Sequence, residues 1–214
     1  MLNFFRKIAV GVDVSDHAIS VACVEGGKNV HVLSVGKAVL EVGVVERGRI
    51  KNKNGLSLAF RHARDEASID DTSLHNTVFG LPESQVFTHL YEFGPEYLSL
   101  SESERRFAIQ KEVSTAIPIN SDDVIYSSSV IFSNKEKTKI LIVAASRVAL
   151  VEWRDFFVSE SVSIVAYDSE ILALFRNLRD ARVAYPVCVV DIGKNTSNIA
   201  IFDLYGICLS YLVP

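Results

Sequence analysis

The chain has 214 residues, a formal net charge of −4 at pH 7 and an isoelectric point near 5.8. Hydrophobic residues make up 49% of it and its mean hydropathy is +0.23, which excludes an intrinsically disordered protein. No basic cluster stands out, so nucleic-acid binding is disfavoured. The longest apolar runs, such as Ile140–Ala145, are too short to span a bilayer, and the N-terminus lacks the features of a signal peptide. We therefore expect a cytoplasmic globular protein.

The first third of the chain is predicted to begin with a β-hairpin. A strand ends at Asp13, a short polar turn follows, and the apolar run Ile19–Val24 returns. After the hairpin we expect, in order, a strand within Val30–Val45, a polar loop over Arg47–Asn54, a helix over Leu56–Ser68 and a strand over His75–Leu81. This order is typical of a mixed sheet backed by helices.

The middle of the chain is predicted to form a compact strand–helix–strand–strand unit. Its helix begins after Ser101, which forms a capping box with Glu104 three residues later, and runs to about Ala116. Its strands are expected at Val86–Phe93, Asp123–Phe132 and Lys139–Ala145.

The last third of the chain alternates between helices and strands. Ser146 is expected to cap a helix over Val148–Ser159. The elements expected after it are a strand over Ser163–Tyr167, a helix over Ile171–Arg179, a hairpin over Val189–Asp203 and a strand over Ile207–Val213. The three cysteines, Cys23, Cys188 and Cys208, lie within predicted strands, and we expect buried free thiols rather than disulfides or metal ligands.

Two hairpins repeat one design at an offset of 178 residues, which places Asp13 on Asp191. At this offset the return strands also match, with Val21 on Ile199 and Ala22 on Ala200. A repeat this far apart is not a solenoid; it indicates two halves that each begin with the same unit.

Turns built from small residues direct backbone N–H groups at one spot, which makes an anion-binding concavity. Two such turns facing each other can hold the phosphates of a nucleotide, and an Asp at each strand end can hold hydrated Mg²⁺. The alternative is an ordinary pair of hairpins, because short motifs of this kind recur often, but the duplicated register favours the phosphate interpretation. The predicted nucleotide-binding residues are Asp13, Ser15, Asp16, Asp191, Gly193, Lys194, Asn195, Thr196 and Ser197, with Asp13 and Asp191 holding Mg²⁺ through water.

The two turns resemble phosphate-1 and phosphate-2 of the actin, Hsp70 and sugar-kinase superfamily. The segments Leu81–Thr88 (LPESQVFT), Gln110–Ile119 (QKEVSTAIPI) and Asp168–Leu174 (DSEILAL) are similar to the type IV pilus assembly protein PilM, a relative of the division protein FtsA. One departure is that phosphate-1 usually has Gly where this chain has Ser15, and a side chain there hinders the approach of a phosphate.

The resemblance implies an α/β, actin-like (ribonuclease H-like) ATPase fold, with a mixed sheet, helices on both sides, an inserted strand–helix–strand–strand subdomain and a truncated second half. It divides the chain into an actin-like subdomain 1A (1–83 and 146–185), an inserted FtsA/PilM-type subdomain 1C (84–145) and the start of subdomain 2A (186–214). Glu170 is then a candidate catalytic residue facing the nucleotide; the alternative is a first-turn carboxylate that stabilises its helix.

The resemblance also implies an ATP- and Mg²⁺-binding scaffold of the type IV pilus machinery, at most a weak ATPase. Such a scaffold docks the cytoplasmic tail of a PilN-like inner-membrane protein, with Val86–Phe93 supplying a strand edge. The alternatives are a nucleotide-free adaptor of a pilus or type II secretion system and, with less support, a small-molecule kinase of the same superfamily. Self-association is expected through the last strand, Ile207–Val213, whose edge is unpaired if the chain ends at Pro214.

Overall fold

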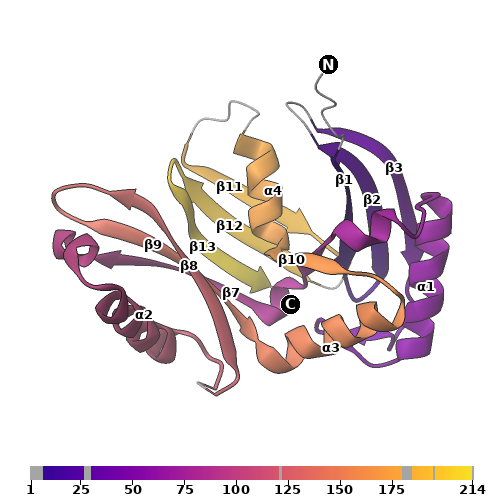
Figure 1. The fold of residues 1–214 in the computed structure, drawn as a ribbon, viewed down its shortest axis with the longest axis horizontal. Helices are drawn as coiled ribbons and strands as arrows, with labels where there is room; N and C mark the ends of the chain where they lie inside the picture. The colour runs from indigo at the N-terminus through magenta and orange to yellow at the C-terminus, as the bar shows by residue number, and fades with distance from the viewer. Residues whose placement is uncertain (1–6, 27–29, 121, 180–184, 195, 214) are drawn as a thin grey trace. The chain divides into compact units, whose positions relative to one another are not determined.

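The computed structural model describes residues 7–26, 30–120, 122–179, 185–194 and 196–213 (Figure 1). Its contacts divide the chain into two compact units. Unit 1 comprises Met1–Ser84 and Leu150–Glu170, and unit 2 comprises Gln85–Ala149 and Ile171–Pro214.

Unit 1 is built on a five-stranded mixed sheet. In spatial order its strands are β10 (Ile164–Ser169), β6 (Thr77–Leu81), β1 (Lys7–Val14), β2 (Ala18–Gly26) and β3 (His31–Val39). The strands β1, β2 and β3 form an antiparallel meander, whereas β6 is parallel to both β1 and β10. The carboxyl ends of β1, β6 and β10 therefore meet at one edge of the sheet.

Two helices, α1 (Lys53–Glu66) and α3 (Arg147–Ser159), pack on one face of this sheet. Phe79 of β6 contacts Trp153 and Phe157 of α3, with ring centroids 4.8 Å apart in both pairs. Phe60 of α1 packs edge-on against Phe157, so both helices share one aromatic core. Burial of these aromatic side chains stabilises unit 1.

A glycine sets how closely α1 approaches the sheet. A Cβ atom added to Gly36 of β3 would lie 1.9 Å from the carbonyl oxygen of Ala63 in α1, so no other residue fits there. The helix begins at Asn52, whose side chain accepts a hydrogen bond from the N–H of Gly55 at 3.0 Å.

The segment between β3 and α1, predicted as a polar loop, contains a short hairpin of β4 (Val45–Glu46) and β5 (Arg49–Ile50). Glu152 of α3 holds it, since its carboxylate pairs with the Arg49 guanidinium and accepts the N–H of Ile50 at 2.5 Å. Trp153 also donates its indole N–H to the carbonyl of Gly48 at 3.0 Å. Three short 3₁₀ turns complete the described elements before residue 100: η1 (Ser73–Asn76), η2 (Glu83–Gln85) and η3 (Pro95–Ser99).

Unit 2 contains the predicted strand–helix–strand–strand segment. Its antiparallel sheet has the order β7 (Val86–Phe93), β9 (Thr138–Ser146) and β8 (Val124–Ser133), and α2 (Glu102–Ala116) covers one face. The predicted capping box is present, because Ser101 accepts the N–H of Glu104 at 3.3 Å and donates its own N–H to the Glu104 carboxylate at 2.8 Å. Ile109 and Val113 of α2 are buried against Ile142.

The second sheet of unit 2 is a meander of β11 (Val187–Ile192), β12 (Ser197–Asp203) and β13 (Gly206–Val213). Helix α4 (Glu170–Arg179) packs on one face through Phe175, whose ring stacks on Phe202 with centroids 4.1 Å apart. Lys139 of β9 links this sheet to the first, because its ammonium lies 3.4 Å from the carboxylate of Asp203. Contacts join residues 85–149 and 171–214 in one unit.

The expected burial of the cysteines is correct for Cys23 and wrong for Cys188 and Cys208, which are exposed. Alternation along β11 directs Val187 and Val189 towards α4 and Cys188 to the opposite face. Cys208 lies in β13, an edge strand of its sheet. Across the described part of the chain, no helix is both long and apolar enough to cross a membrane.

Candidate functional site

The predicted duplication is present in the strand register. Asp13 pairs with Ser20 across the β1–β2 hairpin, and Asp191 pairs with Asn198 across β11–β12. Asp191 follows Asp13 by 178 residues, and Asn198 follows Ser20 by the same number. The strands of the two hairpins are therefore paired in the same register. The turns match as well, because Ser15 donates its N–H to the carbonyl of Ala18 at 2.9 Å and Gly193 donates to that of Thr196 at 3.0 Å.

The repeat extends to a third strand, which the sequence comparison missed. The pairing of β2 with β3 shifts register between Cys23 and Val24, and that of β12 with β13 shifts between Ile201 and Phe202. These positions are again 178 residues apart. A β-bulge is a defined feature of a strand pair, so its recurrence supports a duplicated three-stranded meander.

In the first turn, the side chain of Ser15 occupies the backbone donors. Its hydroxyl oxygen accepts the N–H of His17 at 3.3 Å and the N–H of Ala18 at 3.2 Å. A bound phosphate would have to compete with this hydroxyl for the same N–H groups. Asp16 is also engaged elsewhere: its carboxylate accepts the N–H groups of Arg47 and Gly48 at 2.8 and 3.2 Å.

The second turn has no side chain at the equivalent position. A Cβ atom added to Gly193 would lie 2.6 Å from the carbonyl oxygen of Thr196, so this tight turn needs glycine. Lys194 and Thr196 are exposed and Ser197 begins β12. Asn195 lies outside the described residues. The exposed turn carries one cation and small polar groups, which are compatible with a phosphate.

Unit 1 brings two carboxyl groups together at the carboxyl ends of β1 and β10. Glu170 and Asp13 share a hydrogen bond, and both lie against Gly80 at the end of β6. A Cβ added to Gly80 would be 3.5 Å from Glu170 Cγ and 3.8 Å from Asp13 Oδ1. These are ordinary van der Waals distances, so the pair lies beside Gly80 without requiring a glycine there.

Burial, above all, raises the pKa of Glu170 to about 10. The negative charge of Asp13, the hydrogen bond between the two groups and the charge of Glu83 act in the same direction, and a hydrogen bond from the Glu83 backbone opposes them. Near neutral pH, Glu170 is therefore protonated and donates to Asp13. A protonated Glu170 is a donor that orients Asp13, and it cannot act as a general base at that pH.

Glu83 and Gly80 belong to this cluster, and neither was predicted as a site residue. Ser169 also joins it, since its hydroxyl donates to the Glu83 carboxylate at 3.2 Å. The sequence feature that points to Glu83 is its position just after β6, because the carboxyl ends of neighbouring parallel strands lie at the same edge of a sheet. This feature is informative only when β6 is known to lie beside β1.

The predicted residues fit a hydrated magnesium ion better than direct ligation. No three His, Cys, Asp or Glu side chains among the described residues are grouped as a metal site. Asp13 is exposed and fixed by Glu170, and Asp191 is exposed at the end of β11. Mg²⁺ usually keeps several of its waters, so single exposed carboxylates suit it.

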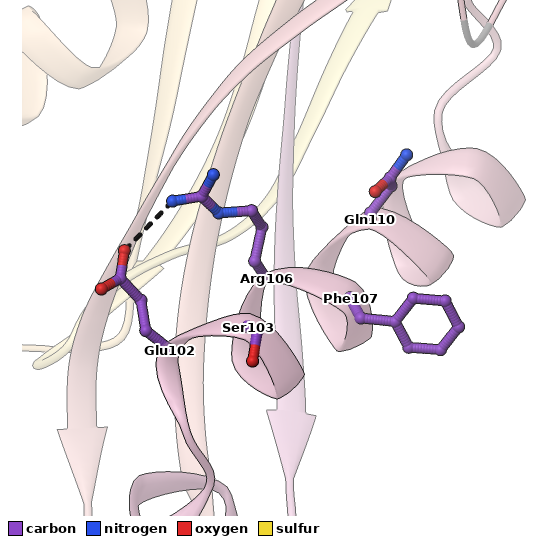
Figure 2. A pocket seen from close by; sticks show the side chains of 5 residues that line it. All are labelled: Glu102, Ser103, Arg106, Phe107 and Gln110. Carbon is purple, nitrogen blue, oxygen red and sulfur yellow. Dashed lines mark hydrogen bonds and ion pairs between the residues drawn. The ribbon is translucent and has the colours of Figure 1, made fainter.

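A surface hollow in unit 2 contains none of the predicted site residues. It lies on the outer side of α2, lined by Glu102, Ser103, Arg106, Phe107 and Gln110. Figure 2 shows the Glu102–Arg106 ion pair, 3.1 Å long, and the Phe107 ring extending away from it. The hollow is open surface of one helix, distinct from both turns.

The structure is similar to several solved structures. The PilM–PilN type IV pilus biogenesis complex matches with a TM-score of 0.80 and 15% identity, over 97% of this chain and 62% of that one. The cytoplasmic domain of EpsL, an inner-membrane component of the type II secretion system of Vibrio cholerae, matches with a TM-score of 0.58 and 10% identity, over 97% and 71%.

The ethanolamine utilization protein EutJ from Carboxydothermus hydrogenoformans matches with a TM-score of 0.55 and 14% identity, over 97% of this chain and 52% of that one. The chain thus spans about three-fifths of the matched chain of the PilM–PilN complex and about half of EutJ. The predicted actin-like ATPase fold is confirmed. No curated protein matches the sequence.

The model of the family described as type IV pilus assembly protein PilM matches residues 11–205, which include both hairpin turns and the segment between them. The chain belongs to this family.

Proposed function

We propose that this chain is a scaffold of a type IV pilus assembly machine, located in the cytoplasm at the inner face of the inner membrane. There it docks the cytoplasmic tail of a PilN-like membrane protein. The observation that carries this proposal is the family match over residues 11–205, supported by the likeness to a PilM chain solved in complex with PilN.

We assign the tail to β7 (Val86–Phe93), an edge strand of the inserted sheet. An extended peptide adds to such an edge through backbone hydrogen bonds. Hydrogen exchange of the protein with and without a synthetic tail peptide tests this assignment. Amides of Val86–Phe93 should gain protection, while those of Val124–Ser133 in β8 at the other edge serve as the internal control. Unchanged exchange in β7 would contradict the assignment.

We further propose that the scaffold binds Mg-ATP, with Asp13 and Asp191 holding water molecules of the metal ion. The repeated turns carry this part of the proposal, because Gly193, Lys194 and Thr196 of the second one are exposed. Bound Mg²⁺ would neutralise phosphate charge. Glu170, hydrogen-bonded to Asp13, is the candidate catalytic residue of this proposal, and we expect ATP hydrolysis to be weak at most.

A second candidate is a nucleotide-free adaptor, and the first turn favours it. The hydroxyl of Ser15 accepts hydrogen bonds from the N–H groups of His17 and Ala18. These N–H groups are therefore not available to donate to a phosphate. A protein of this kind would hold its membrane partner without ATP. Co-purification of the partner tail in nucleotide-depleted buffer would support it.

Calorimetric titration of the full-length natural protein with Mg-ATP distinguishes the two candidates. The nucleotide-binding scaffold predicts binding that Asp191→Ala removes and that Ser15→Gly tightens by about tenfold, because two N–H groups become available. Asp65→Ala, on the exposed side of α1, is the matched control. No binding by folded wild-type protein and by Ser15→Gly would contradict nucleotide binding and favour the adaptor.

A further inference from the structure

The inserted sheet of unit 2 ends at β8, an edge strand that carries neither charge nor proline and whose only bulge lies beyond Val130. Among the described strands, β8 pairs with β9 alone. Its ten residues, VIYSSSVIFS, include no charge and no proline, and Ser127–Val130 are exposed. Proteins usually protect edges with charged side chains, proline or bulges, because unpaired N–H and C=O groups accept any other strand. This edge therefore indicates a strand-pairing surface.

The sequence of β8 is self-complementary about Ser128. An antiparallel copy related by a two-fold axis at this residue would place Ser128 beside its own equivalent. The other pairs across the axis would be Ser127 with Ser129 and Tyr126 with Val130. Serine then meets serine, and apolar side chains meet apolar ones. Like pairs of this kind stabilise neighbouring strands, and the absence of charge removes repulsion at the axis.

We propose that β8 pairs with β8 of a second copy of this chain, so that two three-stranded sheets become one six-stranded sheet. A strand that matches itself fits an isologous interface, in which the same surface is used twice. The opposite edge strand, β7, suits this less well, since it carries Glu92, whose carboxylate is 3.0 Å from the ammonium of Lys137.

A bulge limits the length of this pairing. The register of β8 against β9 shifts between Val130 and Phe132, so the straight part of the edge ends near Val130. The contact is centred on Tyr126–Val130 and is small compared with stable interfaces, which bury roughly 800 Å² per partner. The dimer is therefore weak and depends on concentration.

The joined sheet has the strand order β7-β9-β8-β8-β9-β7, which places both β7 strands at its outer edges. If β7 docks a membrane-protein tail, which rests on the proposed function, the dimer presents two docking edges. Two tails held in one membrane would then strengthen the dimer through their effective concentration.

A charge-swap experiment tests the pairing itself. Sedimentation equilibrium of the wild-type chain should show a monomer–dimer equilibrium. Ser128→Lys and Ser128→Glu should each weaken dimerisation at least tenfold, because like charges meet at the axis, and an equal mixture of the two should restore it. Circular dichroism of each variant, whose substituted side chain is exposed in the monomer, verifies folding.

Tyr211→Lys in β13 is the matched control, because it places a charge on another exposed edge strand of unit 2. The proposal predicts that it leaves the dimer unchanged. Three results would overturn the proposal: a wild-type monomer at millimolar concentration, a dimer that persists in Ser128→Lys, or a dimer lost only in Tyr211→Lys. None of these outcomes depends on tail or nucleotide binding, so the proposed function is tested separately.

Discussion

The meander β1–β3 in unit 1 and the meander β11–β13 in unit 2 share register, turn and bulge, yet their surroundings differ. Val12, beside Phe79 in the sheet of unit 1, is 3% exposed, whereas its equivalent Val190 is 53% exposed. In unit 2 the helix α4 packs on the other face, against Ala200 and Phe202. The strand register is therefore set by the hairpin itself, and the layer that covers it is set by the rest of each unit.

The two turns differ at one residue in a way that changes their chemistry. The hydroxyl of Ser15 accepts hydrogen bonds from two N–H groups of its own turn, whereas Gly193 has no side chain to do so. The first turn is thus stabilised from within, and the second leaves its polar surface to solvent. A single side chain converts a possible anion site into a self-satisfied turn.

The largest predicted effect comes from placing a charge on the equivalent face of each meander. Val12→Asp buries a carboxylate in the core of unit 1 and should lower the free energy of unfolding by about 3 kcal/mol or more. Val190→Asp, at the exposed equivalent, should change it by about 0.5 kcal/mol or less. Urea denaturation followed by circular dichroism measures both. Equal losses of unfolding free energy in the two variants would contradict the difference in burial between Val12 and Val190.

The next largest predicted effect is a pH dependence of the free energy of unfolding, caused by Glu170 in unit 1. The pKa of Glu170 is about 10 in the folded protein, above its ordinary value of 4.5, so the folded state holds an extra proton between these values. Its contribution to stability is complete below pH 4.5 and is lost as pH rises towards 10, by at most about 1.4 kcal/mol per unit.

Glu170→Gln, which cannot ionise, should therefore gain about 2–4 kcal/mol relative to wild type between pH 5 and pH 8. Urea midpoints at the two pH values provide the comparison. Glu102→Gln, on exposed α2, should follow the wild-type pH profile. A Glu170→Gln profile parallel to wild type would show that this carboxyl group ionises normally in the folded protein.

A smaller effect separates the two turns. Gly193→Ala should destabilise unit 2 by about 2 kcal/mol, because the added methyl group meets the Thr196 carbonyl and the backbone must shift. Ser15→Ala should cost about 1 kcal/mol, because it removes two hydrogen bonds from an exposed turn. Local opening measured by amide exchange distinguishes them. A Gly193→Ala variant as stable as wild type would contradict the tight turn.

Local patterns predicted much of this fold. The capping box at Ser101 and Glu104 specified the start of α2, and the 178-residue offset specified both hairpins in register. These features depend on neighbouring residues, whose spacing along the chain fixes their hydrogen bonds and faces.

Contacts between distant segments were not predictable in this way. Asp16 was predicted as a nucleotide-binding residue, and its hydrogen bond from the backbone N–H of Arg47, 31 residues later, could not be read from the local sequence. The place of Glu83 beside Glu170 depends on the parallel pairing of β6 with β1 and β10. Sequence spacing does not encode such pairings, so these partners emerge only from the three-dimensional structure.

The most direct test of the contrast between the turns is amide hydrogen exchange at single-residue resolution, with and without Mg-ATP. We predict that the amides of His17 and Ala18 are protected without nucleotide and gain little from it, whereas those of the Gly193 turn gain protection. In Ser15→Gly, His17 and Ala18 should exchange faster until nucleotide is added. Fast exchange at His17 and Ala18 in the wild-type protein, or an unchanged Gly193 turn in the presence of Mg-ATP, would contradict this account.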